Sequence, residues 1–274
     1  THVSPTMIKF NAFPGGRRFA VTFSYDDGSF HDKQLISLFN QYGLKGTFHL
    51  NSASLGTMDR IKPEEAAVLY NGHEIACHTA THPFPDELSP CDLIREIIQD
   101  RIALEKISGK IVRGMSYPYG RLNEAVVAAM ASCGIAYSRT TVCHNGFALP
   151  QDFLKWDGTC HHKNAEDAVN RFIALMAKER AAWTGQSLLY IWGHSFEFDR
   201  ENNWDFIEKI CQKLGGLDGV WYATNIEIFD YVQAQRSLYA SADGRRIHNP
   251  SAQSVWVSVD GTPVEVKPGS TLEA

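Results

Sequence analysis

Short hydrophobic runs alternate with longer amphipathic segments along most of this 274-residue chain. The runs are rich in Val, Ile, Phe and Tyr and are about six residues long, as is typical of buried strands. They lie at residues 19–25, 45–51, 73–78, 111–118, 135–140, 153–158, 188–194 and 219–225. The segments between them are typical of helices and lie near residues 32–42, 63–71, 90–107, 122–132, 165–182, 203–214 and 226–238. The alternation predicts a parallel sheet covered by helices.

The number of repeating units favours a closed sheet. Seven or eight strand–helix units, without a glycine fingerprint for dinucleotides, indicate an α/β fold with a (β/α) barrel of seven or eight parallel strands. From about residue 239 the pattern changes, and Val and Trp alternate with polar residues around the turn sequence "DGTP". That pattern is typical of a hairpin. We therefore expect a barrel domain over residues 1–238 and a small C-terminal β-hairpin appendage over residues 239–274.

Composition excludes several classes of function. The net charge of -5 and the absence of a basic stripe argue against a nucleic-acid-binding protein. No hydrophobic run reaches the roughly 18 residues that a membrane-spanning helix needs. The six cysteines form no CxxC pair, and several lie in apolar segments, so we expect buried free thiols rather than disulfides. Free thiols favour the cytoplasm over secretion, although a removed signal peptide would leave no trace.

Polar and reactive side chains stand at the C-terminal ends of five of the expected strands. They are Asp26 and Asp27, His78 and His82, the "YPYG" segment 117–120, Trp156 with Asp157, and His194. In a (β/α) barrel the active site forms at the C-terminal ends of the strands. The fold therefore predicts that these residues meet on one face, although more than a hundred residues separate some of them.

The segment "HTATH" at 78–82 is the clearest candidate for metal binding. Its two imidazoles are four residues apart, which is one helical turn, so both could face a single ion. A carboxylate commonly completes such a site and leaves positions open for water and substrate. Taken alone, the pair is also compatible with ordinary surface histidines, and Asp27-Gly28 is compatible with a simple turn.

Together, "YDDG", "HTATH", "YPYG", Trp156-Asp157 and "WGHS" resemble the motifs of a known family. The chain is similar to polysaccharide deacetylases of carbohydrate esterase family four, from about residue 19 to residue 235. The resemblance implies a distorted (β/α) barrel and a set of residue roles. Asp26 would be the general base, His194 the general acid, and Tyr119 would offer a backbone N–H to the oxyanion. Asp27, His78 and His82 would bind the metal, and Tyr117, Trp156 and Asp157 would line the substrate pocket.

The chain departs from the family pattern at three places. Ser116 stands where the family often has an arginine that orients the catalytic aspartate, and Arg113 is offset by three residues. The family's late His-Asp pair is replaced by His194-Ser195, with Glu197 and Asp199 nearby. Trp156-Asp157 is a thin match to its motif. We interpret "CHH" at 160–162, together with Cys143-His144, as a loop of ordinary residues, since the spacing matches no standard zinc site.

The resemblance implies a metal-dependent hydrolase that removes N- or O-linked acetyl groups from a saccharide. A metal-activated water would attack, with an aspartate as base and a histidine as acid. The cofactor would be one divalent ion, zinc first, with cobalt or nickel as alternatives. The expected partner is an acetylated oligo- or polysaccharide, with no nucleic acid and no membrane span, and oligomer formation is left open. Two alternatives remain: a hydrolase of another amide or cyclic imide, and a non-catalytic carbohydrate-binding relative.

Overall fold

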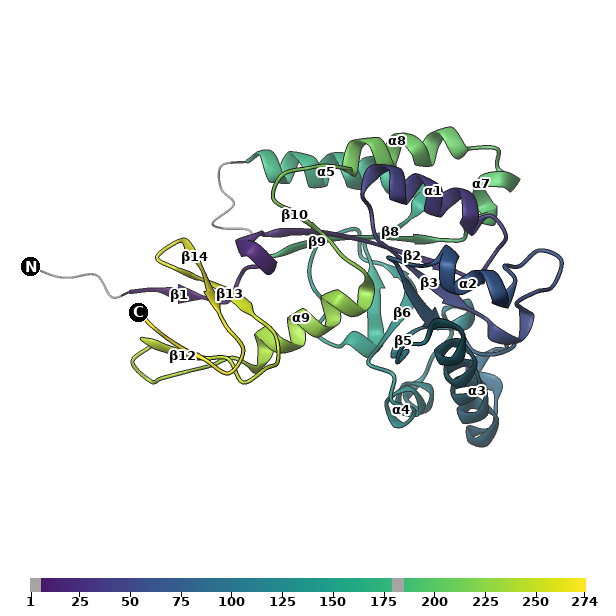
Figure 1. The fold of residues 1–274 in the computed structure, drawn as a ribbon, viewed down its shortest axis with the longest axis horizontal. Coiled ribbons are helices and arrows are strands. Elements are labelled where there is room, and N and C mark those ends of the chain that lie inside the picture. Colours follow the sequence, from purple (N-terminus) through teal and green to yellow (C-terminus); the bar gives the residue numbers. More distant parts are fainter. Residues whose placement is uncertain (1–5, 179–184) are drawn as a thin grey trace, which may run out of the picture.

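The computed structural model describes residues 6–178 and 185–274, and a parallel sheet of nine strands lies at its centre (Figure 1). These strands are β2 (Phe19–Asp26), β3 (Gly46–Leu50), β4 (Glu74–Cys77), β5 (Gly114–Ser116), β6 (Tyr137–Cys143), β7 (Trp156–Gly158), β8 (Cys160–His161), β9 (Ser187–Gly193) and β10 (Val220–Tyr222). All eight expected strands are present. The sixth is shorter than expected, because Phe153–Lys155 form a 3-10 turn before β7.

The sheet closes on itself through β7 and β8. The strand order is β7-β6-β5-β4-β3-β2-β9-β8, and β10 pairs with the first residues of β2. Only Thr159 separates β7 from β8, and its backbone N–H donates to the carbonyl of Tyr190 at 2.8 Å. One short segment therefore pairs with β6 at one end and with β9 at the other, so the expected barrel of parallel strands is confirmed. Two-residue β8 was not predicted, because it is too short to show a periodic pattern.

Helices cover the outside of this sheet. They are α1 (Asp32–Tyr42), α2 (Pro63–Leu69), α3 (Pro90–Ser108), α4 (Glu124–Ser132), α5 (Ala165–Ala177), α7 (Phe196–Arg200), α8 (Trp204–Leu214) and α9 (Asn225–Ser237). Figure 1 shows α1, α5 and α8 side by side on one side of the sheet, with α3 and α4 on the other. The expected helix 165–182 is confirmed to residue 177, and residues 179–182 lie outside the described part of the chain. Five-residue α7 was not predicted.

Alternate residues of β2 face either the covering helices or the inside of the barrel. Phe23 and Tyr25 face outward and pack on Phe39 of α1, with ring centroids 4.7 and 6.1 Å away. Successive strand residues point to opposite faces, so Ser24 and Asp26 point into the barrel. Both accept hydrogen bonds from Arg139 of β6 there. The period-two pattern of the first strand thus delivers a carboxylate to the barrel interior at its C-terminal end.

The C-terminal appendage is larger than a single hairpin. The expected hairpin is β13 (Val255–Val259) and β14 (Thr262–Val266), joined at Asp260-Gly261 with φ of 49° and 82°. The strand β1 (Ile8–Lys9), from the other end of the described chain, pairs with β13. A second antiparallel sheet contains β11 (Tyr239–Ala240), β12 (Arg246–His248) and β15 (Thr271–Glu273). The appendage is therefore confirmed as antiparallel β-structure, and the domain boundary at residue 238 stays a prediction.

The sequence predicts free thiols and no membrane-spanning helix. All six cysteines lie in described residues and are free thiols, with four buried, Cys143 half-buried and Cys91 exposed. Within residues 6–178 and 185–274, no helix is both long enough and apolar enough to cross a membrane.

Candidate active site

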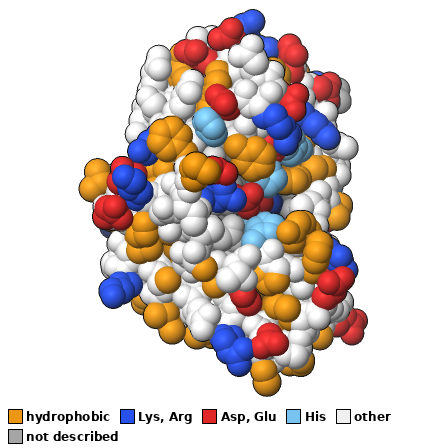
Figure 2. Space-filling view, turned by 90° about the vertical axis from the view of Figure 1, so that its right-hand side faces the viewer, with side chains coloured by type: hydrophobic (Ala, Val, Ile, Leu, Met, Phe, Trp, Pro, Cys, Tyr) orange, Lys and Arg blue, Asp and Glu red, His pale blue; other side chains and the backbone are white. Residues whose placement is uncertain are grey.

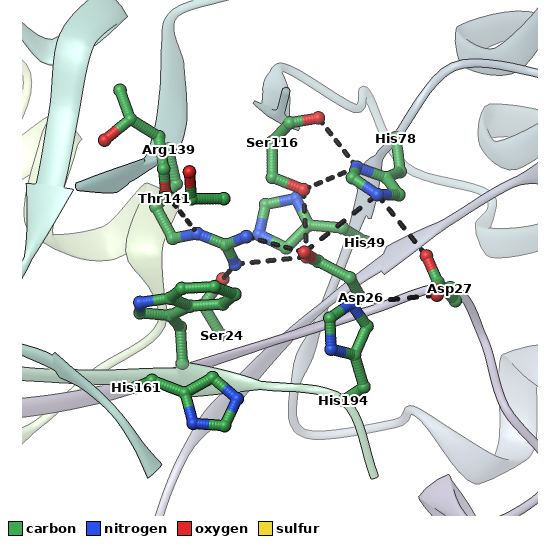
Figure 3. Close-up of polar contacts among 12 residues, drawn as sticks. Ser24, Asp26, Asp27, His49, His78, Ser116, Arg139, Thr141, His161 and His194 are labelled. Atoms are coloured by element: carbon green, nitrogen blue, oxygen red, sulfur yellow. Dashed lines mark hydrogen bonds and ion pairs between the residues drawn. The ribbon is translucent and has the colours of Figure 1, made fainter. Parts of the chain in front are cut away.

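Five of the residues predicted from the sequence meet at the C-terminal ends of the strands. Figure 2 shows histidine side chains gathered in a hollow across the middle of one face, with hydrophobic side chains on both sides. The carboxylate of Asp27 lies 3.4 Å from Nε2 of both His78 and His82, and 3.8 Å from Nε2 of His194. Asp26 Oδ2 lies 3.9 Å from His78 Nε2. The predicted convergence of these residues is confirmed, and Figure 3 shows four of them, Asp26, Asp27, His78 and His194.

His78 and His82 approach each other through a loop and not through a helix. Residues 78–82 have no helical assignment, and Thr79 and His82 have φ values of 67° and 63°. The helical spacing argument was therefore wrong, although the two rings do meet, with centroids 4.7 Å apart. Buried Asp100 of α3 accepts the backbone N–H of His78 at 2.8 Å, and Asn51 donates to the carbonyls of His78 and Thr79. These contacts fix an irregular backbone whose sequence gives no periodic signal.

The donor atoms of Asp27, His78 and His82 fit a divalent ion. Zinc bonds of 2.0–2.2 Å in a tetrahedral site place two ligand atoms about 3.4 Å apart, which matches both imidazole distances to Asp27 Oδ1. That oxygen is buried, and no described residue donates a hydrogen bond to it. His78 Nδ1 lies 2.7 Å from the carbonyl of Ser116, which can only accept, so Nδ1 carries the proton. The lone pair of Nε2 is then free for the ion, as in many zinc sites.

Asp27 is held in an unusual backbone conformation. Its φ is 83°, a region that side-chain-bearing residues rarely adopt, and its N–H donates to the His49 carbonyl at 2.9 Å. Such strain costs about 1–3 kcal/mol and is concentrated at functional sites. Burial raises the pKa of Asp27, but the imidazoles of His78 and His82 outweigh burial and hold the pKa well below its usual range. The residue is therefore an ionised carboxylate at neutral pH.

Arg139 of β6 takes the place of the motif arginine that the sequence lacks. Its guanidinium makes two contacts with Asp26, at 2.6 Å to Oδ2 and 3.1 Å to Oδ1, and Ser116 Oγ donates to Oδ1 at 2.9 Å. Arg139 is fully buried and lies over the ring of Trp192 at 4.5 Å. Burial raises the pKa of Asp26, but Arg139 outweighs it and holds the pKa well below its usual range.

Arg113 does not reach Asp26. Its side chain points elsewhere and pairs with Asp230 of α9 at 2.7 Å. Sequence reasoning missed Arg139, although an arginine inside the buried strand "IAYSRT" is a usable signal, because a buried guanidinium requires an acidic partner.

Glu197 supports His194. His194 Nδ1 donates to Glu197 Oε1 at 2.6 Å, and the His194 backbone N–H donates to the same oxygen at 3.0 Å. Burial lowers the pKa of His194, but the hydrogen bond to Glu197 outweighs it and the pKa is raised. His161 Nε2 also lies 3.0 Å from Glu197, and His162 Nε2 lies 3.6 Å from it. Residues 160–161 form β8, so the interpretation of "CHH" as a loop was wrong for Cys160 and His161.

The residue after His194 is fixed by a buried acid. Ser195 Oγ donates to Asp32 at 2.6 Å, and Tyr70 donates to the other oxygen of the same carboxylate at 2.6 Å. Burial raises the pKa of Asp32 to about 7, since these two hydroxyls compensate it only in part. Asp199, in contrast, lies 3.8 Å from His31 on the exterior, so of the two acids near His194 it is Glu197 that contacts it.

The four remaining predicted site residues lie in three different environments. The exposed ring of Tyr119 lies between His82 and Phe84, with centroids 4.5 and 4.2 Å away, so it borders the site. Tyr117 and Trp156 are each only 1% exposed and pack within the hydrophobic core. Neither offers a surface to a substrate, which corrects that expectation. Asp157 accepts a hydrogen bond from Thr140, which anchors it to β6.

Residues 15–138 match the family model for polysaccharide deacetylase. The match covers less than half of the chain, and over these residues the chain is similar to that family. It is 30% identical over 117 residues to a chitin deacetylase from Pestalotiopsis sp., covering 42% of this chain and 39% of the relative. It is 27% identical over 135 residues to a chitooligosaccharide deacetylase from Bradyrhizobium sp. (strain ANU 289), covering 48% and 60% of the two chains. The matched segment thus spans less than two thirds of either curated relative.

Solved structures support the fold over a larger share of the chain. A Mycobacterium smegmatis protein described as a polysaccharide deacetylase has a TM-score of 0.60 at 17% identity, covering 82% of this chain and 93% of its own. The peptidoglycan deacetylase PdaC from Bacillus subtilis has a TM-score of 0.53 at 20% identity, with coverage of 82% and 95%. At this level of identity the likeness shows that the barrel is shared.

Proposed function

We propose that this protein is a metal-dependent hydrolase that removes acetyl groups from an acetylated saccharide. The observation that carries the proposal is the cluster of Asp27, His78 and His82, whose donor atoms have the spacing of ion ligands. Asp26 and His194 flank that cluster, so a base and an acid stand beside the place where an ion would lie. Because the curated relatives are chitin and chitooligosaccharide deacetylases, oligomers of N-acetylglucosamine are the first substrate class to consider.

One divalent ion would be held by Asp27, His78 and His82, zinc first, with cobalt or nickel as alternatives. When bound, such an ion supplies Lewis acidity, which polarises an acyl oxygen and lowers the pKa of water. Hydrogen bonds from other residues to His78 support this assignment. Ser116 fixes the tautomer of His78, and Asp100 fixes the backbone from which that imidazole extends.

Asp26 would accept a proton from the attacking water. Its Oδ2 lies 3.9 Å from His78 Nε2 and so faces the ligand cluster. Arg139 and Ser116 hold the carboxylate in a single orientation, which reduces the loss of freedom on reaching the transition state. Burial raises the pKa of Asp26, but Arg139 outweighs burial and keeps the carboxylate ionised at neutral pH, as a proton acceptor must be.

His194 would donate a proton to the leaving amine or alkoxide. Its Nδ1 is held by Glu197, so Nε2 points toward Asp27 and the hollow where a substrate would lie. Contact with a carboxylate favours the imidazolium form that a general acid requires. The backbone N–H of Tyr119, at the rim of the hollow, is proposed to stabilise the oxyanion.

Two alternative functions remain. The first is hydrolysis of another amide or a cyclic imide on the same barrel, which the same acid, base and ligand set could perform. The second is carbohydrate binding without catalysis, which a complete set of reactive residues disfavours. A cytoplasmic location stays a prediction from the free thiols.

A substrate panel separates these possibilities. The purified protein would be assayed for acetate release from N-acetylglucosamine oligomers and from O-acetylated xylan, and for hydrolysis of a simple acyl amide and a cyclic imide. We expect acetate release from at least one saccharide. Turnover of the amide or the imide alone would instead support the first alternative. Saturable binding of the oligomer without acetate release would support the second.

A further inference from the structure

Glu197 accepts hydrogen bonds from two imidazoles that come from different strands. His194 follows β9, and His161 belongs to β8, the strand that closes the barrel. His161 Nε2 lies 3.0 Å from both carboxylate oxygens, while His194 Nδ1 lies 2.6 Å from one of them. The Glu197 side chain is largely buried, with 13% of it exposed. The Glu197 carboxylate is therefore held between the imidazole of His194 and the imidazole of His161.

The contacts of His161 define its tautomer. Its Nδ1 accepts the backbone N–H of Lys163 at 3.1 Å, so this nitrogen carries no proton. The proton is on Nε2, which then donates to Glu197. The ring of His161 is also fixed edge-on against Trp192, with centroids 5.0 Å apart. His161 is thus a neutral donor in a rigid position, and this differs from the role of His194.

Arg200 is an alternative partner for the Glu197 carboxylate. Arg200 Nη2 lies 3.9 Å from Oε2 and is largely exposed, on the surface of α7. The His194 backbone N–H also donates to Oε1, but a glutamate has three rotatable side-chain bonds, so without a donor to Oε2 the carboxylate could turn toward this guanidinium and away from His194 Nδ1. His161 opposes that turn, because its hydrogen bond holds the carboxylate on the β8 side of the site.

We propose that His161 is a positioning residue for the general acid: through Glu197, it holds the His194 imidazole in the orientation that protonates the leaving group. The inference rests on the function proposed above and adds a residue that acts in only one half of the reaction. Asp26, Asp27 and the two ligand histidines make no contact with His161 among the interactions of the described residues. Removing His161 therefore impairs protonation of the leaving group and spares water attack.

Loss of His161 should therefore affect only substrates whose leaving group needs a proton. An amine or alkoxide is a strong base and needs a proton as it leaves, whereas a nitrophenolate is a stable anion and leaves without one. His161→Ala is expected to lower kcat on an N-acetylglucosamine oligomer by about 10- to 100-fold, part of the 10²–10⁴ that general acid catalysis supplies, with KM unchanged. On p-nitrophenyl acetate it should retain at least about half of the wild-type rate, because that leaving group needs no acid.

Two further variants control the measurement. The amide N–H of His161→Gln can still donate to Glu197, so most of the oligomer activity should return. His248→Ala removes an appendage histidine that contacts Thr271, and it should match the wild type on both substrates. An equal loss on both substrates, no loss on the oligomer, or a Gln variant as impaired as the Ala variant would overturn the proposal.

A crystal structure of His161→Ala tests the same inference without activity. The distance from Glu197 Oε1 to His194 Nδ1, 2.6 Å in the native arrangement, should lengthen beyond hydrogen-bonding range. An unchanged distance would overturn the positioning role. If the wild-type protein releases no acetate from any substrate, the proposed function fails, and this structural measurement still decides whether His161 holds Glu197.

Discussion

The candidate site joins two parts of the chain that hold their reactive groups in different ways. Asp26, Asp27, His78 and His82 lie within the matched residues 15–138. There the main chain is fixed by hydrogen bonds, with Asp100 and Asn51 holding the histidine loop and the His49 carbonyl holding Asp27. Beyond residue 138, Arg139, His161, His194 and Glu197 are held mainly by side-chain ion pairs and hydrogen bonds to one another or to distant carboxylates. The ligand side follows the family pattern, while the acid side departs from it. The difference indicates that one barrel can keep the cluster of Asp27, His78 and His82 while the residues that support Asp26 and His194 change.

The largest expected effect concerns the ligand side. Asp27→Ala removes the proposed ligand whose buried Oδ1 faces both imidazoles, so the affinity for the ion should fall sharply. Activity should fall by at least about 10³-fold, since a bound ion contributes several kcal/mol to such reactions. Metal content by mass spectrometry and acetate release would be measured on the same samples. A variant that keeps both its ion and its activity would show that Asp27 is not a required metal ligand.

Arg139→Ala tests the contact by which Arg139, beyond the matched residues, supports Asp26 within them. Removing the guanidinium leaves the buried Asp26 carboxylate without its partner, which should lower the free energy of unfolding by about 3–5 kcal/mol. Urea unfolding followed by circular dichroism would measure it. The matched control is Arg113→Ala, which breaks a half-exposed pair with Asp230 and should cost no more than about 1 kcal/mol. Equal costs for the two variants would mean that Arg139 is no special support for Asp26.

Glu197→Gln tests the acid side on its own. The amide cannot stabilise an imidazolium, so activity on an N-acetylated oligomer should fall by about 10²-fold while the metal content stays at the wild-type level. Glu197 contributes to the raised pKa of His194, and a general acid acts in its protonated form. The basic limb of the pH–rate profile should therefore move to lower pH. A loss of metal together with activity would show that the two sides are not separable.

Asp32→Asn is expected to have the smallest effect on activity and a clear effect on pH dependence. The pKa of buried Asp32 is raised to about 7, so the folded state binds a proton that the unfolded state releases near pH 4. Its contribution to stability is present below about pH 4 and is lost as the pH rises to about 7. The variant should show a flatter decline in the free energy of unfolding across that interval. An unchanged slope in urea titrations at several pH values would count against this assignment.

Much of the fold could be predicted because its signals are periodic. The eight expected strands and seven expected helices are present, since each buries a continuous face that leaves a pattern in the sequence. Strands of two residues, such as β1 and β8, carry no such pattern. Their positions depend on pairing with β13 and β9, which lie far away along the chain.

The site could be predicted where residues stand at strand ends and could not where support comes from distant side chains. Asp26, Asp27, His78, His82 and His194 meet as the barrel rule requires. The partners of Glu197 and Asp26 come from β8 and β6, so no local spacing relates them. Trp156 failed as a substrate contact because a large aromatic ring at a strand position is better stabilised by core packing, here against Tyr137 and Tyr190.

Titration of the metal-stripped protein tests the central claim most directly. Acetate release from an N-acetylglucosamine oligomer would be followed as zinc is added to the stripped wild-type chain, with Asp27→Ala beside it. The account predicts no activity before addition, a rise that ends at one ion per chain, and no rise for the variant. Full activity in the stripped wild-type chain, or an equal rise in Asp27→Ala, would contradict it.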